Sequence, residues 1–299
     1  MSPSFRCSTA STARGESQAG TASTVRSFLL VEDPGPWGVD AVSDSRLPAE
    51  VKVEIAARAG RAGVRVLMIR RHGRSSPGGL TVFAAYAAVA RPWVETCTVD
   101  GPASLLDIDL DRLGRGQSPG LTVHDSPLFL VCTHGRHDVC CAERGRPVAA
   151  ALQAHLPEQT WEVSHIGGDR FAGNLLVLPD GLYYGRVEPE AAVPLAKGHL
   201  AGTLDLAHLR GRCGYPFPVQ AAEIFLREEI GQVRTDALTL VSRVRSGTTT
   251  VAVFTDGERS WQVEVRSDPE SRQQLTCRAA RPNGAAAHSL VAITTSPVV

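Results

Sequence analysis

Residues 128–141 read LFLVCTHGRHDVCC, and residues 161–178 read WEVSHIGGDRFAGNLLVL. The first segment is an apolar run that stops at a cysteine, and the second places a histidine beside two glycines between apolar runs. Together they hold three of the seven cysteines and three of the nine histidines in the chain. Thiolates and imidazoles gathered at loop positions suit a transition metal or an iron–sulfur cluster. These two segments therefore predict a metal centre.

The whole chain has the composition of an ordinary globular protein. It has 299 residues, of which 43% are hydrophobic and 21% charged, so a sizeable core can form. The formal net charge is zero, so no overall field attracts nucleic acid or an anionic membrane. The longest apolar run, residues 80–90, is too short to cross a bilayer. We therefore expect neither nucleic acid nor a membrane among the partners.

The cysteines indicate a reducing compartment. Their number is odd and their spacing uneven, and a chain of this length needs no disulfide framework, so free thiols are the simpler interpretation. The first 24 residues are rich in Ser, Thr and Ala but lack the apolar region of a secretory signal, although they loosely fit a transit peptide. We expect a cytoplasmic protein.

Apolar periodicity and turn residues predict the order of the elements. In the first half they predict a strand at 27–33, a helix at 48–61, strands at 64–69, 80–88 and 93–99, and a polar turn at 70–79. In the second half they predict a strand at 128–131, a helix from Cys141 or Ala142 to about 156, and strands at 159–163, 175–178 and 182–187, the last two joined by an Asp-Gly turn. Beyond these come a helix at 221–230 and strands at 237–244, 248–254, 261–265, 275–278 and 289–294.

This order predicts an α/β (α+β) protein with a repeated core. Residues 28–35 echo residues 128–135, since in each a β-rich run leads into a Gly-containing loop. Strand, helix, strand and hairpin is the thioredoxin-like order. We expect two tandem thioredoxin-like half-units, 1–120 without ligands and 121–210 with them, followed by an added α+β region at 211–299.

The segments VCTHGRHDVCCAERGRP and WEVSHIGGDRFAGNLLVLPDGLYYGRV resemble the sucrase/ferredoxin-like family, whose members are similar to thioredoxin-like [2Fe-2S] ferredoxins. The likeness is strong over the middle third and weaker over residues 20–42. It implies a [2Fe-2S] cluster and electron transfer. The word sucrase carries no implication, because the chain shows no paired-carboxylate glycosidase signature.

The resemblance also implies a ligand set. Cys132 and Cys141, spaced C-x8-C, match the family's first pair, and His165-x3-Asp169 stands where the second pair belongs. Eukaryotic relatives have His-x3-His there, whereas this chain has Asp169, a harder ligand that suits iron–sulfur chemistry less well. The fourth ligand therefore stays open among Asp169 and three residues of the first loop: Cys140, His134 and His137.

The other cysteines and histidines have simpler interpretations. Adjacent side chains diverge, so Cys140 is expected to be a small buried apolar residue if Cys141 is a ligand. His134 and His137 are expected to organise the loop or to contact a ligand. The remaining cysteines, Cys7, Cys97, Cys213 and Cys277, are expected to be structural.

Three functions fit these residues. The first is an electron carrier with a [2Fe-2S] cluster of mixed Cys/His ligation, which needs redox partner proteins but no substrate pocket. The second is a zinc-binding structural module on the same residues. The third is a thiol-redox enzyme of thioredoxin type, disfavoured because no C-x-x-C is present and a vicinal Cys140–Cys141 disulfide is strained. We expect a carrier rather than an enzyme; neither the oligomeric state nor the identity of the partners follows from the sequence.

Overall fold

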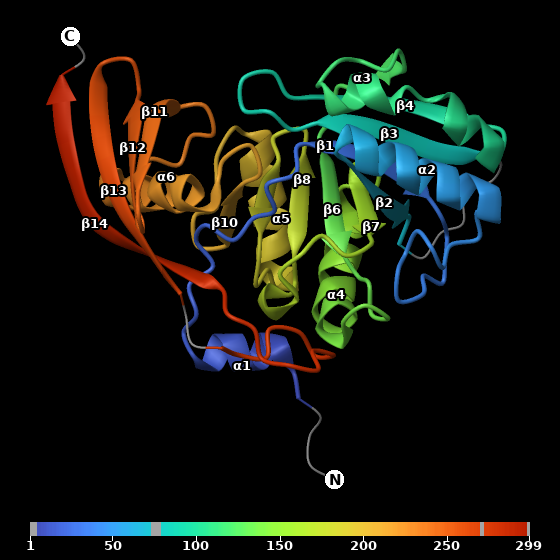
Figure 1. Cartoon of the computed structure of the whole chain (residues 1–299), viewed down its shortest axis with the longest axis horizontal. Helices are drawn as coiled ribbons and strands as arrows, with labels where there is room; N and C mark the ends of the chain where they lie inside the picture. Colours follow the sequence, from blue (N-terminus) through green and yellow to red (C-terminus); the bar gives the residue numbers. More distant parts are fainter. Residues whose placement is uncertain (1–4, 73–78, 270–271, 298–299) are drawn as a thin grey trace.

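The computed structural model describes residues 5–72, 79–269 and 272–297. Most of the predicted turn at 70–79 falls in the gap 73–78 and so lies outside the described residues. Figure 1 shows two sheets side by side, a large one and a smaller one formed by the C-terminal strands. Among the described residues, no helix combines the length and the apolar character that crossing a membrane requires.

The first half contains one helix between its first two strands. Its elements are β1 (Ser27–Glu32), α2 (Ala49–Ala62), β2 (Val64–Arg70), β3 (Leu80–Tyr86) and β4 (Trp93–Val99). Helix α2 buries Val51, Ile55 and Ala59, four residues apart, as one apolar stripe. It ends at Gly63, whose φ of 68° is a left-handed conformation that favours glycine. A short connection follows: η1 (Pro102–Asp107), α3 (Leu110–Gly114) and β5 (Thr122–Val123).

The second half repeats this pattern. Its elements are β6 (Leu128–Cys132), α4 (Val139–His155), β7 (Thr160–Val163), η2 (Asp169–Phe171), β8 (Leu175–Leu178), β9 (Leu182–Tyr184), α5 (Pro189–Leu200) and β10 (Leu209–Arg212). Helix α5 is absent from the sequence prediction. It contains Pro194 and Gly198, both poor helix formers. It forms because Ala192, Leu195 and Ala196 pack into the core beneath β6 and β8.

The large sheet is nearly symmetric in its strand order, β10-β9-β8-β6-β7-β2-β1-β3-β4-β5. Within each half the first two strands are parallel and the third and fourth add antiparallel, giving β4-β3-β1-β2 and β9-β8-β6-β7. The halves meet where β2 pairs with β7 in antiparallel fashion. This is the predicted thioredoxin-like order, so the predicted fold class is confirmed.

One hydrophobic cluster belongs to both halves. Phe28 and Leu30 of β1 share it with Leu128 and Leu130 of β6, whereas the alternate residues of each strand pack with their own half. Alternation along a strand sends neighbouring side chains to opposite faces. Because the core is shared, the boundaries 1–120, 121–210 and 211–299 stay a prediction.

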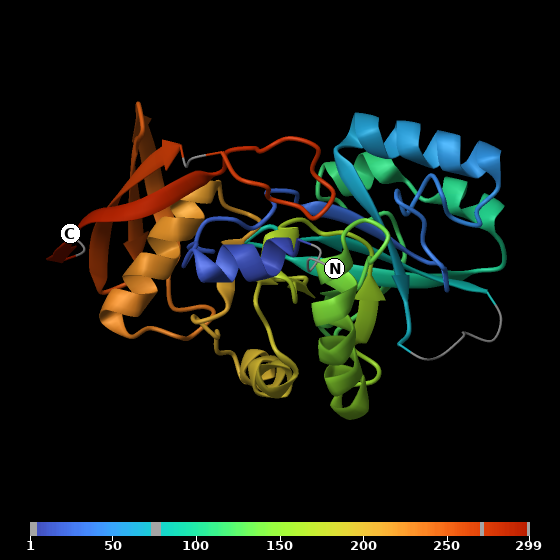
Figure 2. The same cartoon turned by 90° about the horizontal axis from the view of Figure 1, so that it is seen from below.

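The C-terminal region is a helix on a four-stranded antiparallel sheet, as expected. It comprises α6 (Phe217–Ile230), β11 (Thr239–Ser246), β12 (Thr249–Thr255), β13 (Arg259–Pro269) and β14 (Ala286–Pro297). The strand predicted at 275–278 is wrong, because the described residues between β13 and β14, 272–285, leave the sheet. Figures 1 and 2 show this segment, here named the C-terminal excursion, reaching helix α1 (Cys7–Ala13).

Candidate metal centre

Strand β6 and helix α4 bring two thiols together. Cys132 is the last residue of β6, and Cys141 lies in the first turn of α4. The donor atoms of Cys132, Cys141 and His165 all lie within 4.8 Å of one another, and both cysteines are buried. The approach depends on Gly145, where an added Cβ would lie 2.0 Å from the carbonyl oxygen of Cys132. Only a residue without a Cβ lets the helix pack this closely on the strand end.

The loop from His165 to Asp169 is held by side chains from three other segments. Arg65 of β2 donates to the His165 carbonyl at 2.7 Å, Arg210 of β10 to the Gly167 carbonyl at 3.0 Å, and Asn174 to the Gly168 carbonyl at 2.8 Å. Gly168 has φ of 80°, and a Cβ there would lie 2.3 Å from the Arg210 guanidinium. The loop therefore has one defined conformation beside the two thiols.

Asp169 lies between the thiols and the imidazoles. Its Oδ1 is 3.2 Å from Cys141 Sγ and 2.8 Å from His165 Nδ1, and its Oδ2 is 3.8 Å from His137 Nε2. The short contact with His165 is not a well-directed hydrogen bond, and among the described residues Nδ1 of His165 has no hydrogen-bond partner. Nδ1 instead has the Asp169 carboxylate as an ion-pair partner. A metal bound between them would take Nδ1 or the carboxylate as a ligand.

Charge in the site is concentrated on Cys132, His165 and Asp169. The hydrogen bond from Cys141 lowers the pKa of Cys132, and His165 lowers it further. Burial lowers the pKa of His165, but Asp169 and Cys132 outweigh burial and raise that pKa to about 9. Burial raises the pKa of Asp169, and contact with His165 reverses this and holds it below its usual range. These pKa directions favour a thiolate, an imidazolium and a carboxylate side by side.

The two histidines of the first loop differ in position. His134 uses both ring nitrogens within the protein, since Nε2 lies 2.7 Å from the Gly38 carbonyl and Nδ1 accepts from the backbone N–H of His165 at 3.2 Å. His137 stacks on His165 with ring centroids 3.7 Å apart. It also belongs to a group with His165 and Asp169 whose donor atoms lie within 4.8 Å. Of the open candidates for a fourth ligand, Asp169 and His137 adjoin the site. His134 instead accepts the backbone N–H of His165 and so orients the loop from His165 to Asp169.

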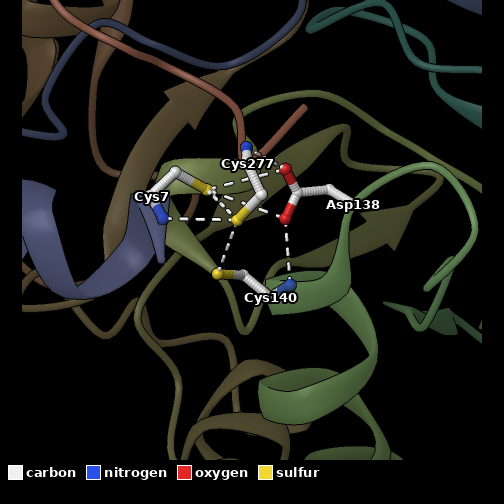
Figure 3. Close-up of side chains that lie close together, drawn as sticks. All are labelled: Cys7, Asp138, Cys140 and Cys277. Atoms are coloured by element: carbon white, nitrogen blue, oxygen red, sulfur yellow. Dashed lines mark hydrogen bonds between the residues drawn. The ribbon is translucent and has the colours of Figure 1, made fainter. Parts of the chain in front are cut away.

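The thiol of Cys140 lies in a different group. Its Sγ is 3.4 Å from that of Cys277, beside Cys7 and Asp138, as Figure 3 shows. Successive residues of a helix point about 100° apart, so neighbouring cysteines face different surroundings. The structure thus brings Cys132, Cys141, His165 and Asp169 together and leaves out Cys140. The sequence predicts only a structural role for Cys7 and Cys277, because nothing local links positions 270 residues apart.

The fold and the donor set describe a thioredoxin-like α/β protein with a thiol–imidazole site. Residues 18–211 match the sucrase/ferredoxin-like family, and since this is more than half of the chain, the protein belongs to that family.

Two yeast proteins share part of the sequence, each called "Altered inheritance of mitochondria protein 32". The chain is 33% identical over 73 residues to the one from Meyerozyma guilliermondii, covering 21% of this chain and 26% of that protein. It is 26% identical over 117 residues to the one from Debaryomyces hansenii, covering 36% of this chain and 39% of that protein. The matches thus span well under half the length of these relatives.

Among solved structures, the thioredoxin-like [2Fe-2S] ferredoxin from Aquifex aeolicus resembles part of the chain. Identity is 20%, the TM-score is 0.27, and the match covers 31% of this chain and 96% of that one. A cysteine-to-serine variant of the same ferredoxin matches with 20% identity and a TM-score of 0.25, covering 28% of this chain and 97% of that one.

Proposed function

We propose that the chain is an electron carrier in which Cys132, Cys141, His165 and Asp169 hold a [2Fe-2S] cluster. The observation that carries the proposal is two buried thiols facing an imidazole–carboxylate pair, with the donor atoms of Cys132, Cys141 and His165 all within 4.8 Å of one another. Thiolate with imidazole is a known donor set for such clusters. Membership of the sucrase/ferredoxin-like family supports the same assignment.

The site has a buried side and an open side. Cys132 and Cys141 are at most 1% exposed, whereas the side chains of His165 and His137 are 23% and 36% exposed. A pocket of about 220 Å³ lies at this open side, between the histidines and residues 39–42 of the first half. When bound, a [2Fe-2S] cluster passes one electron at a time. We infer that a redox partner protein approaches at the histidines.

Arg210 gives the site a buried positive charge. It is 1% exposed, burial lowers its pKa to about 10, and it donates to Thr21, Gly167 and Asn174. A cation near the centre stabilises the added negative charge when the centre is reduced. The role we infer for Arg210 is therefore to hold the His165–Asp169 loop and to raise the reduction potential.

Zinc is the second candidate. The donor atoms of Cys132, Cys141 and His165 are close enough for a single tetrahedral ion. A thiol-redox role fits less well, because both thiols are buried and exchange requires access by a partner thiol.

The experiment that decides among these is metal and sulfide analysis of protein purified without oxygen. We expect about two Fe and two labile sulfides per chain at this site, with visible charge-transfer bands. Zinc in place of iron and sulfide, in freshly expressed protein, would refute the electron-carrier proposal. Cys97→Ser is the control for substitutions of the cysteine ligands and should keep the metal content of the wild type. Cys97 lies on β4, outside the groups that contain Cys132 and Cys141 or Cys7, Cys140 and Cys277.

The partner and the compartment remain part of the proposal. Zero net charge favours a protein partner over nucleic acid or an anionic membrane. A reducing compartment such as the cytoplasm fits the seven free cysteines.

A further inference from the structure

The residues Cys7, Asp138, Cys140 and Cys277 form a second cluster of metal-ligand donors, separate from the proposed electron-transfer site. Figure 3 shows their side chains converging from three segments: Cys7 from α1, Asp138 and Cys140 from the start of α4, and Cys277 from the C-terminal excursion. One donor atom from each lies within 4.8 Å of all the others. Nothing in the local sequence gathers these segments, so the tertiary fold assembles the cluster.

The spacing of the donor atoms suits one tetrahedral ion. Cys277 Sγ lies 3.4 Å from Cys140 Sγ and 3.6 Å from Cys7 Sγ, and Cys7 Sγ lies 3.7 Å from each oxygen of Asp138. Two thiolates bound to one zinc at about 2.3 Å lie about 3.8 Å apart, and a thiolate and a carboxylate oxygen about 3.5 Å apart. The observed separations are close to these distances between ligands of one tetrahedral ion, whereas the two sulfurs of a disulfide lie about 2.05 Å apart.

Asp138 is a second observation that favours a cation at this cluster. It is fully buried, yet among the described residues no Lys, Arg or His forms an ion pair with it. Its carboxylate accepts the backbone N–H groups of Cys140 at 2.9 Å and Cys277 at 2.6 Å, which orient it toward the thiols. Buried charges in proteins are paired with an opposite charge or coordinate a metal. Asp138 caps the N-terminus of α4, which supplies partial positive charge, and an ion among the three sulfurs would supply the full charge.

We propose that Cys7, Asp138, Cys140 and Cys277 bind one zinc ion with three thiolates and one carboxylate oxygen. Thiolates select a borderline-soft cation, and four filled protein positions make a closed structural site rather than a catalytic one. Such a site would fasten the C-terminal excursion and α1 to the start of α4. Because Cys140 and Cys141 are adjacent, the second site would also fix the helix turn that presents Cys141 to the first.

Metal content per chain tests the proposal in the full-length protein purified without oxygen. We expect Cys277→Ser to contain one zinc less than the wild type and an unchanged amount of iron. Cys97→Ser, the matched control, should keep both. The difference of one zinc holds whether the first site carries iron or zinc, so the outcome is independent of the proposed function.

Two results would overturn the second site. One is equal zinc in Cys277→Ser and wild type, and the other is a Cys7–Cys277 disulfide without zinc in freshly isolated protein, seen by mass spectrometry after alkylation. If Cys277→Ser does not fold, the Cys132→Ser/Cys141→Ser variant, which lacks the thiols of the first site, is loaded with zinc. X-ray absorption should then show three sulfur neighbours and one oxygen, and two or fewer sulfurs would reject the assignment.

Discussion

Cys140 and Cys141 are consecutive residues whose thiols belong to two different donor groups. The first turn of α4 sends one toward Cys7 and Cys277 and the other toward Cys132 and Asp169. This divergence is a property of helix geometry, in which neighbours point about 100° apart. At the scale of single residues, substituting serine for Cys140 and for Cys141 should therefore affect two different metal sites.

The first prediction concerns these two thiols. Cys141→Ser should abolish the visible absorption of the protein purified without oxygen, because it removes a thiolate from the proposed cluster. Cys140→Ser should leave that absorption nearly intact and remove zinc instead. Absorption and metal analysis check both variants. Bleaching by Cys140→Ser with a normal spectrum in Cys141→Ser would reverse our assignment of the two sites.

The second prediction concerns pH and the metal-free protein. His165 has a raised pKa, so its stabilising effect is complete below about 6.5 and is lost as pH rises through about 9. Cys132 has a lowered pKa, so the stability that its thiolate contributes is complete above the ordinary pKa of a thiol. That stability is lost as pH falls through the lowered pKa. Between about pH 6.5 and the ordinary pKa of a thiol, folding adds a proton at His165 and removes one at Cys132. The two pH dependences of the free energy of unfolding therefore cancel in the wild-type protein.

Cys132→Ser should reveal the His165 dependence, since Asp169 still holds the imidazolium. We expect the free energy of unfolding of metal-free Cys132→Ser to fall by about 1–2 kcal/mol between pH 6.5 and 9. Urea unfolding at several pH values measures it. Adding His165→Ala should make the profile flat, and a dependence that persists in the double variant would assign the titration to another group.

At the scale of elements, the metal centre depends on how closely α4 approaches β6. Gly145 occupies the contact, and its backbone lies against the Cys132 carbonyl. Gly60, in α2, is also a helical glycine, but an added Cβ there meets no atom within 4 Å. The same substitution should therefore have opposite effects in the two helices.

The third prediction uses this pair. Gly145→Ala should destabilise the protein by about 1–3 kcal/mol or more, because it forces α4 away from the strand end and separates Cys141 from Cys132. Gly60→Ala should stabilise by up to about 1 kcal/mol through helix propensity. Thermal unfolding gives both values, and iron content should fall only in Gly145→Ala. Equal stability of the two variants would contradict the tight approach.

At the scale of the whole molecule, a narrow junction joins the two halves of the sheet. Strands β2 and β7 pair at only two positions, Ile69 with Val163 and Arg70 with Glu162. Glu162 is 4% exposed and accepts hydrogen bonds from Arg70 at 2.6 Å and from Thr133 at 2.7 Å, with His72 also in contact. One buried carboxylate therefore ties β2 to both β7 and the residue after Cys132.

The fourth prediction tests this junction. Glu162→Ala should cost about 3 kcal/mol, because it leaves the partly buried Arg70 without its carboxylate and Thr133 without its acceptor. Glu162→Gln keeps one acceptor oxygen and should cost less. Glu158→Ala, whose side chain is 82% exposed, is the control and should change stability by less than about 0.5 kcal/mol. A loss no larger for Glu162→Ala than for the control would show that packing alone holds the halves together.

Local pattern in the sequence determined much of the fold. Alternating or continuous apolar runs predicted β1, β6, β7 and β8, because the burial of a strand follows from the hydrophobicity of its consecutive residues. The spacing of Cys132 and Cys141 and of His165 and Asp169 was likewise readable, since each pair spans one loop. Helix α5 was missed because Pro194 and Gly198 oppose helix formation locally and only packing against the sheet overrides them.

Tertiary structure alone decided the second donor group and the direction of Cys140. Cys7 and Cys277 lie 270 residues apart and meet only because the C-terminal excursion leaves its sheet and reaches α1. The segment 275–278 looks like a strand, yet Cys277 is directed to Asp138 and not to a neighbouring strand. Contacts between distant segments depend on how whole elements pack, and no local periodicity records them, whereas secondary structure and short-range ligand spacing are properties of neighbouring residues.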